Sequence, residues 1–144
     1  MSFKGVHFSR PMGDVTMWKW ILIALGVISI ANGLYMWFAP MGWYQAIPGV
    51  AMMGPFNLHF IRDIALVFAF SGGAMMFGAM RPMPAIAVAG ATWPCMHALF
   101  HIQIWMARGF PFDEVALVNL VGIQVPSWLA LFAAVQILRK GALR

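Results

Sequence analysis

The chain has 144 residues, of which 62% are hydrophobic and only 9% are charged. A soluble domain carries roughly 25% charged residues, so this chain cannot cover itself with a polar surface, and we predict a single-domain integral membrane protein over residues 1–144. The net charge of +5 comes from sparse basic residues beside apolar segments, a pattern typical of membrane topology signals and not of a nucleic-acid-binding surface. The single cysteine, Cys95, lies inside an apolar run, which excludes a disulfide framework and a CxxC metal motif.

The first part of the chain predicts one membrane span followed by an apolar connection. Residues 1–17 are expected to form a short cytoplasmic arm, and residues 20–38 a first span close to the ~20 apolar residues that cross a bilayer. The connection of residues 40–57 contains no Lys, Arg, Asp or Glu. Within it, residues 41–47 are predicted to form a short interfacial helix that the following Pro-Gly pair ends. We expect this aromatic connection to lie against the bilayer or a neighbouring protein.

Three further apolar segments predict spans at about residues 58–80, 85–107 and 115–138. Asn57 is positioned to cap the helix that follows it through its side chain. Pro94 is expected to kink the 85–107 helix, because proline lacks the N–H of a helical hydrogen bond. The sequence thus predicts an all-α membrane protein, a bundle of four transmembrane helices. Small residues of the 58–80 span are expected to let helices approach closely, namely Gly72, Gly73, Ala74 and Gly78.

Basic residues are distributed unevenly between the two sides of this predicted bundle. Arg62 and Arg108 fall on one side. The other seven fall on the side of the chain termini: Lys4, Arg10, Lys19, Arg81, Arg139, Lys140 and Arg144. Because cytoplasmic segments carry the excess of Lys and Arg, both termini are predicted to be cytoplasmic, in a multi-pass protein of the cytoplasmic membrane.

Ionisable side chains within the spans form two i, i+4 pairs. His59 and Asp63 share one face of the 58–80 helix, and His97 and His101 share one face of the 85–107 helix. When two neighbouring helices run antiparallel, the residue numbers of any two side chains at the same depth add up to the same total. The pairs His59–His101 and Asp63–His97 have the same total, so each pair is predicted to share one depth. We therefore predict two layers of paired ligand-type side chains in the outer half of the bilayer. Ionisable groups inside a membrane are costly, so a functional site is the default interpretation.

Imidazole and carboxylate groups suit metal ligation. The cluster of His59, Asp63, His97 and His101 is predicted to bind a metal ion, with Cu, Zn or Fe as candidates. Alternatively, His59 together with His97 or His101 supplies the axial ligands of a b-type haem between helices. A third alternative is a quinone or other redox ligand, with a histidine donating to its carbonyl and Asp63 relaying protons. No HExxH motif, phosphate loop or Ser-His-Asp order supports a hydrolase, no catalytic residue is assigned, and whether the protein is an enzyme stays open.

Several of these residues also have a structural interpretation. His59 alone is compatible with an interfacial histidine, and Asp63 with a counter-ion for Arg62. Arg62 itself is expected either to pair with an acidic residue or to extend to lipid headgroups. Amides within the spans are expected to form interhelical hydrogen bonds: Asn32, Asn119 and Gln124.

The segments GPFNLHFIRD, residues 54–63, and HALFH, residues 97–101, resemble a group of small uncharacterised bacterial four-span membrane proteins, in the broad neighbourhood of the DoxX-like four-helix proteins. The resemblance covers residues 20–138. It implies the four-helix architecture and a bacterial inner-membrane setting, and it carries over no catalytic residues.

Two functions from different classes follow from the sequence. The first is a redox-linked membrane protein that binds a metal ion or haem through the His/Asp cluster. The second is a non-catalytic accessory subunit that packs against a larger membrane complex, which the apolar connection and the small-residue surfaces permit. The expected partners are the lipid bilayer, a larger membrane complex or further copies of the chain, and a quinone.

Overall fold

The computed structural model describes residues 13–81 and 83–141, and these residues form helices and turns with no strand among them. Four helical segments in this part of the chain are long and apolar enough to cross a membrane, which confirms the predicted all-α, four-span architecture and indicates a multi-pass membrane protein. The elements in chain order are α1 (Gly13–Phe38), α2 (Pro40–Ala46), α3 (Leu58–Met80), α4 (Pro84–Ala107), α5 (Glu114–Asn119), the π-helical η1 (Leu120–Gln124) and α6 (Val125–Gly141).

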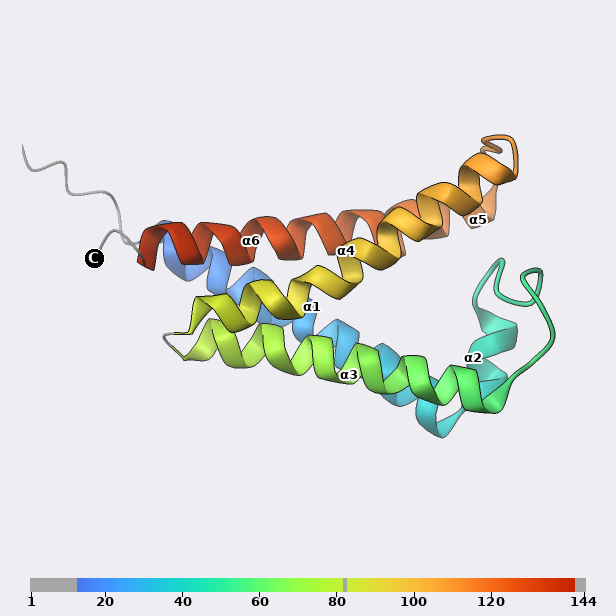
Figure 1. The fold of residues 1–144 in the computed structure, drawn as a ribbon, viewed down its shortest axis with the longest axis horizontal. Helices are drawn as coiled ribbons and strands as arrows, with labels where there is room; N and C mark the ends of the chain where they lie inside the picture. The colour runs from blue at the N-terminus through green and yellow to red at the C-terminus, as the bar shows by residue number, and fades with distance from the viewer. Residues whose placement is uncertain (1–12, 82, 142–144) are drawn as a thin grey trace, which may run out of the picture.

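The last three elements follow one another without a break and form the fourth span. The start of α1 and the end of α6 lie at one end of the bundle, which we call the terminal end (Figure 1). Helix α2 and the turn of residues 108–113 lie at the opposite end, called here the α2 end (Figure 1).

The first span begins earlier than the sequence predicted. Helix α1 starts at Gly13, inside the predicted arm of residues 1–17, of which residues 1–12 lie outside the described part of the chain. This early part of α1 is packed: Trp18 makes an edge-to-face contact with Phe132, with ring centroids 5.2 Å apart, and Leu22 is fully buried. Trp18 and Leu22 therefore belong to the packed part of the bundle.

All four spans share one core at the terminal end. Close approach there depends on small residues: a Cβ on Gly78 would lie 2.3 Å from the Ala87 nitrogen, and one on Gly72 would lie 2.5 Å from the Gly26 carbonyl oxygen. The predicted close-approach role is thus confirmed at Gly72 and Gly78, whereas Gly73 faces open space. The buried residues of this core are Leu22, Met75, Ala79, Ala87, Ala91, Ala130, Ala133 and Ala134.

The core at the α2 end lies between α1 and α3. Its buried residues are Met36, Ile61 and Ala65, and aromatic side chains of the 40–57 connection pack over them. The predicted short helix is present as α2, and the predicted cap is present as well, because the Asn57 side chain accepts a hydrogen bond from the Phe60 N–H.

Much of the 40–57 connection packs on its own chain, and not only against the bilayer or a neighbour as the sequence suggested. The Trp43 indole donates to the Asn32 side chain at 3.0 Å, and the Tyr44 hydroxyl donates to the Gly54 carbonyl at 2.7 Å. Gly49 has a φ of +90°, and a Cβ there would lie 2.8 Å from a Val115 methyl carbon. The connection therefore reaches from α1 and α3 across to α5.

Helices α3 and α4 are close at the terminal end and diverge toward the α2 end (Figure 1). Pro94 lies inside α4 and has no N–H for the Gly90 carbonyl four residues earlier. The Ser71 hydroxyl of α3 donates to that carbonyl instead, at 2.5 Å. Phe68 packs on Trp93 one turn further along, with ring centroids 4.8 Å apart. The antiparallel register is therefore close to the predicted one over the packed half of the two helices.

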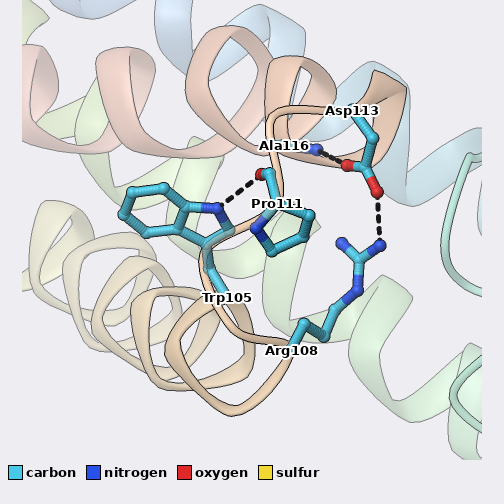
Figure 2. A network of polar contacts seen from close by, with 5 residues as sticks. All are labelled: Trp105, Arg108, Pro111, Asp113 and Ala116. Carbon is cyan, nitrogen blue, oxygen red and sulfur yellow. Dashed lines mark hydrogen bonds and ion pairs between the residues drawn. The ribbon is translucent and has the colours of Figure 1, made fainter.

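The turn between α4 and α5 is fixed by three side-chain contacts (Figure 2). The Trp105 indole donates to the Pro111 carbonyl at 2.8 Å, and the Arg108 guanidinium donates to the Asp113 carboxylate. The other oxygen of Asp113 accepts from the Ala116 N–H at 2.9 Å and so caps α5. These two hydrogen bonds, from Arg108 first and Ala116 second, lower the pKa of Asp113, so the capping group stays a carboxylate at neutral pH.

Candidate functional site

The two histidines of α4 lie together inside the third span. The rings of His97 and His101 meet edge to face with their centroids 4.6 Å apart and an interplanar angle of 69°. Both side chains are half-buried. The i, i+4 spacing thus places two imidazoles on one face of the helix, as the sequence predicted.

Aromatic rings surround this histidine pair. Trp93 stacks on His97 with an interplanar angle of 13° and a centroid distance of 5.1 Å. Phe68 reaches His97 from α3, with centroids 6.1 Å apart, and Phe100 contacts His101 at 6.0 Å. The imidazoles therefore lie against carbon-rich surfaces instead of hydrogen-bonding side chains.

The ring nitrogens of the histidine pair have no partner within residues 13–81 and 83–141. No hydrogen bond or ion pair in this part of the chain involves either imidazole, and their contacts are with other rings. The nitrogens are accessible at the surface of the bundle, because no buried side-chain nitrogen or oxygen in the described part of the chain lacks a hydrogen-bond partner. At a surface that faces lipid instead of water, a polar group without a partner is costly. An imidazole pair in this state is suited to bind something else.

His59 and Asp63 form a second pair, separate from the first. The His59 Nε2 atom lies 3.3 Å from an Asp63 carboxylate oxygen, and the two side chains are 88% and 58% exposed. Asp63 shares a side of α3 with Phe70, two turns further along and 78% exposed. The face of α3 that meets α4 is a different one, since it carries Phe68 and Ser71.

The structure therefore does not assemble the predicted four-residue cluster of His59, Asp63, His97 and His101. Among the described residues no group of three or more His, Cys, Asp or Glu side chains could hold a metal ion. The constant sum of residue numbers predicts which residues lie at equal depth, but it does not predict the direction in which each side chain points around the helix axis. Divergence of α3 from α4 toward the α2 end separates the two pairs further (Figure 1).

A hydrogen-bond network joins the histidine-bearing turn of α4 to the fourth span. The Gln124 amide donates to the Ala98 carbonyl at 2.9 Å and to the Asn119 side chain at 3.0 Å. Asn119 donates to the His101 carbonyl at 3.4 Å, and the Trp128 indole donates to Gln124 at 3.1 Å. The predicted interhelical role of these amides is confirmed, and it positions the backbone of the histidine pair.

The π-helical segment η1 was not predicted. Its last hydrogen bond runs from the Val125 N–H to the Leu120 carbonyl, five residues earlier. Pro126 follows directly and lacks the N–H that would bond to the Gly122 carbonyl, which favours a local change in helical pitch. A π-helical turn contains about one residue more than an α-helical turn. Asn119 and Gln124, five residues apart, therefore lie on the same side of the helix, and both side chains reach α4. The Pro126 signal was visible in the sequence, but the wider turn was not.

Fold and site together define a four-span α-helical membrane protein with a histidine pair inside its third span. Comparisons of the chain with protein families, with curated proteins and with solved structures find no match. The resemblance to DoxX-like proteins therefore stays a prediction.

Proposed function

We propose that this protein binds a metal ion at His97 and His101 and that the bound ion has a redox-linked role. The observation that carries this proposal is the edge-to-face imidazole pair whose nitrogens have no partner in the described part of the chain. Neutral imidazole is the commonest protein metal ligand, and Cu, Zn and Fe all accept it. Of these, Cu and Fe change oxidation state and fit a redox-linked role, whereas Zn does not. Metal ligation would supply the partner that the surrounding aromatic rings do not.

The number of donors favours an open site over a closed structural one. The histidine pair offers two nitrogen ligands, whereas a structural zinc site takes about four protein ligands. The remaining positions would be filled by solvent, by a small molecule or by a residue of another protein. Exchangeable positions of this kind are typical of sites that perform chemistry or transfer a metal ion.

A b-type haem is less compatible with this pair than a metal ion. Two axial ligands lie on opposite faces of the porphyrin, but His97 and His101 touch each other edge to face. A haem at this site would use one of the two and would need a second ligand, such as His59, brought in from elsewhere. A quinone carbonyl accepting from an imidazole N–H is the third possibility that an experiment must separate.

Elemental analysis and an absorption spectrum of the purified protein test the proposal. We expect a stoichiometric metal ion without a Soret band in the wild type, and loss of that metal in His97→Ala and in His101→Ala. His59→Ala and Asp63→Asn serve as controls, because the structure places them in a separate pair, and both are expected to retain the metal. Equal metal content in all five proteins would refute ligation by the histidine pair. Loss of metal in the two control variants would instead support the four-residue cluster.

A second candidate is an accessory subunit of a larger membrane complex. The fourth span is the least covered by the rest of the described chain. In its most apolar stretch of 18 residues, 11% of the residues are buried, against 33% in the corresponding stretch of Leu58–Met80. Lipid or a neighbouring protein must cover this surface. A purified protein that carries neither metal nor haem would favour this second function.

We further propose that the protein lies in a bacterial inner membrane with both termini in the cytoplasm. Seven of the nine basic residues support this orientation by the positive-inside rule. Reporter domains fused at the C-terminus and near Gln45 are expected to report opposite sides, with the C-terminus cytoplasmic. A periplasmic C-terminus would overturn the orientation and would place the histidine pair in the other half of the bilayer.

A further inference from the structure

A groove runs between α1 and α3 on the surface of the bundle near the α2 end. It encloses about 230 Å³ and is lined by Gly33, Leu34, Trp37, Phe38, Ala65, Leu66 and Ala69. Gly33 and Ala65 are buried and form its base, and a Cβ on Gly33 would lie 2.7 Å from the Ala65 carbonyl oxygen. Leu34 and Leu66 are about half exposed, at 49% and 55%, and rise on either side. It is thus a short apolar groove that is open along one side and extends over about one turn of each helix.

Arg62 stands at one end of this groove. Its guanidinium carbon lies 5.4 Å from the ring centroid of Trp37, one of the groove residues. On α3, Arg62 precedes Leu66 by one helical turn and lies about 6 Å from the start of the helix at Leu58. The apolar groove therefore has the positively charged Arg62 at one end, and this end lies near the start of α3, where a membrane would meet water.

The positive charge of Arg62 is not neutralised by the described residues. Asp63, the nearest acidic residue in sequence, pairs with His59, and Asp113 pairs with Arg108. The ring face of Trp37 orients the guanidinium by a cation–π contact, which leaves its N–H donors available. A guanidinium with this arrangement is suited to bidentate hydrogen bonding with a phosphate.

We propose that this groove binds a phospholipid with an anionic headgroup, with one acyl chain along α1 and α3 and the headgroup phosphate on Arg62. The occupant is identified by its chemistry: the headgroup-proximal part of a methylene chain matches the apolar groove, and the phosphate complements the cation at its end. Tryptophan beside the headgroup region is typical of lipid contacts at the interface, and basic positions beside membrane helices recognise anionic lipids. This proposal uses none of the residues of the histidine pair, so it stands independently of metal binding.

Native mass spectrometry of the detergent-purified protein with added phosphatidylglycerol tests the proposal. We expect the wild type to retain one phosphatidylglycerol molecule and Arg62→Gln to bind it about tenfold more weakly or worse, the effect of losing a hydrogen bond to a charged group. Arg81→Gln is the matched control, because it removes the same charge immediately after the same helix, at the terminal end. It is expected to retain the lipid. Equal binding by Arg62→Gln and the wild type, or equal loss in Arg81→Gln, would overturn the proposal.

Two further measurements separate the contribution of the acyl chain from that of the phosphate and guard against misfolding of Arg62→Gln. Glycerol phosphate carries the phosphate without acyl chains, so it should not displace phosphatidylglycerol at equal concentration; displacement would overturn the role of the groove. Arg62→Lys keeps the charge but loses the planar fork, so we expect intermediate binding, and this variant replaces Arg62→Gln should the latter fail to fold. A second copy of the chain in the groove, seen as a dimer that excludes the lipid, would also refute the proposal.

Discussion

Replacing Gly78 with alanine is expected to lower the free energy of unfolding by about 1–3 kcal/mol, the usual cost of overpacking a core. A Cβ at this position would lie 2.3 Å from the Ala87 backbone nitrogen and 2.8 Å from the Ala87 Cα. Backbone atoms cannot move aside as the tip of a long side chain can, so α3 and α4 would have to separate. Alanine is otherwise the better helix former by about 1 kcal/mol, so a measured loss would report the collision directly.

Gly73→Ala is the matched control for this prediction. Gly73 lies on the same helix, but a Cβ there would meet nothing within 4 Å. We expect this variant to be as stable as the wild type or more stable by about 0.4–1 kcal/mol. Chemical unfolding in detergent, followed by circular dichroism, measures both variants. Similar changes in the two would show that close approach at Gly78 does not stabilise the bundle.

The span boundaries were predictable because they depend on local properties of the sequence. The predicted 58–80 and 85–107 spans agree closely with Leu58–Met80 and Pro84–Ala107, since uncharged apolar stretches and their Pro and Asn borders are visible in the chain itself. Helix α1 differs because the chain is already helical at Gly13, the first described residue. The contact of Trp18 with Phe132 joins residues far apart in the sequence, and periodicity does not reveal such a contact.

The candidate site was only half predictable for a related reason. Spacing along one helix identifies residues on a common face, and the structure brings His97 and His101 together accordingly. Whether two faces on different helices meet depends on helix rotation and crossing, which the sequence of a single chain does not give. His59 and Asp63 lie on an exposed side of α3, so the predicted layers of paired ligands do not form.

Pro94 lies in α4 between the part of the helix that packs closely on α3 and the part that carries the histidine pair. Its missing N–H leaves the Gly90 carbonyl dependent on the Ser71 hydroxyl of the neighbouring helix. Gly90 is itself closely packed, since a Cβ there would lie 2.8 Å from the Met75 nitrogen. The Ser71–Gly90 hydrogen bond therefore joins α3 to α4 at a point where the two helices are closely packed.

Ser71→Ala is expected to lower the free energy of unfolding by about 1–3 kcal/mol, because it leaves a buried carbonyl without any hydrogen-bond donor. In a Pro94→Ala background, the N–H restored at position 94 can bond to the Gly90 carbonyl, so the same serine change should cost far less. The double-mutant cycle should therefore show a coupling free energy of about 1 kcal/mol or more. Chemical unfolding of the four proteins in one detergent supplies the measurement.

Ser29→Ala is the control for the Ser71–Pro94 double-mutant cycle. The Ser29 hydroxyl also donates to a helix carbonyl, that of Phe68, at 2.8 Å. Four residues after Phe68 stands Gly72, which keeps its N–H, so this carbonyl has a donor in its own helix whether or not serine is present. Loss of Ser29 is expected to cost only about 0.6 kcal/mol, the average for interhelical hydrogen bonds in membranes. It should also show no coupling to Pro94→Ala. Coupling of equal size for Ser29 and Ser71 would mean that Pro94 acts through the general packing of the bundle and not through the Gly90 carbonyl.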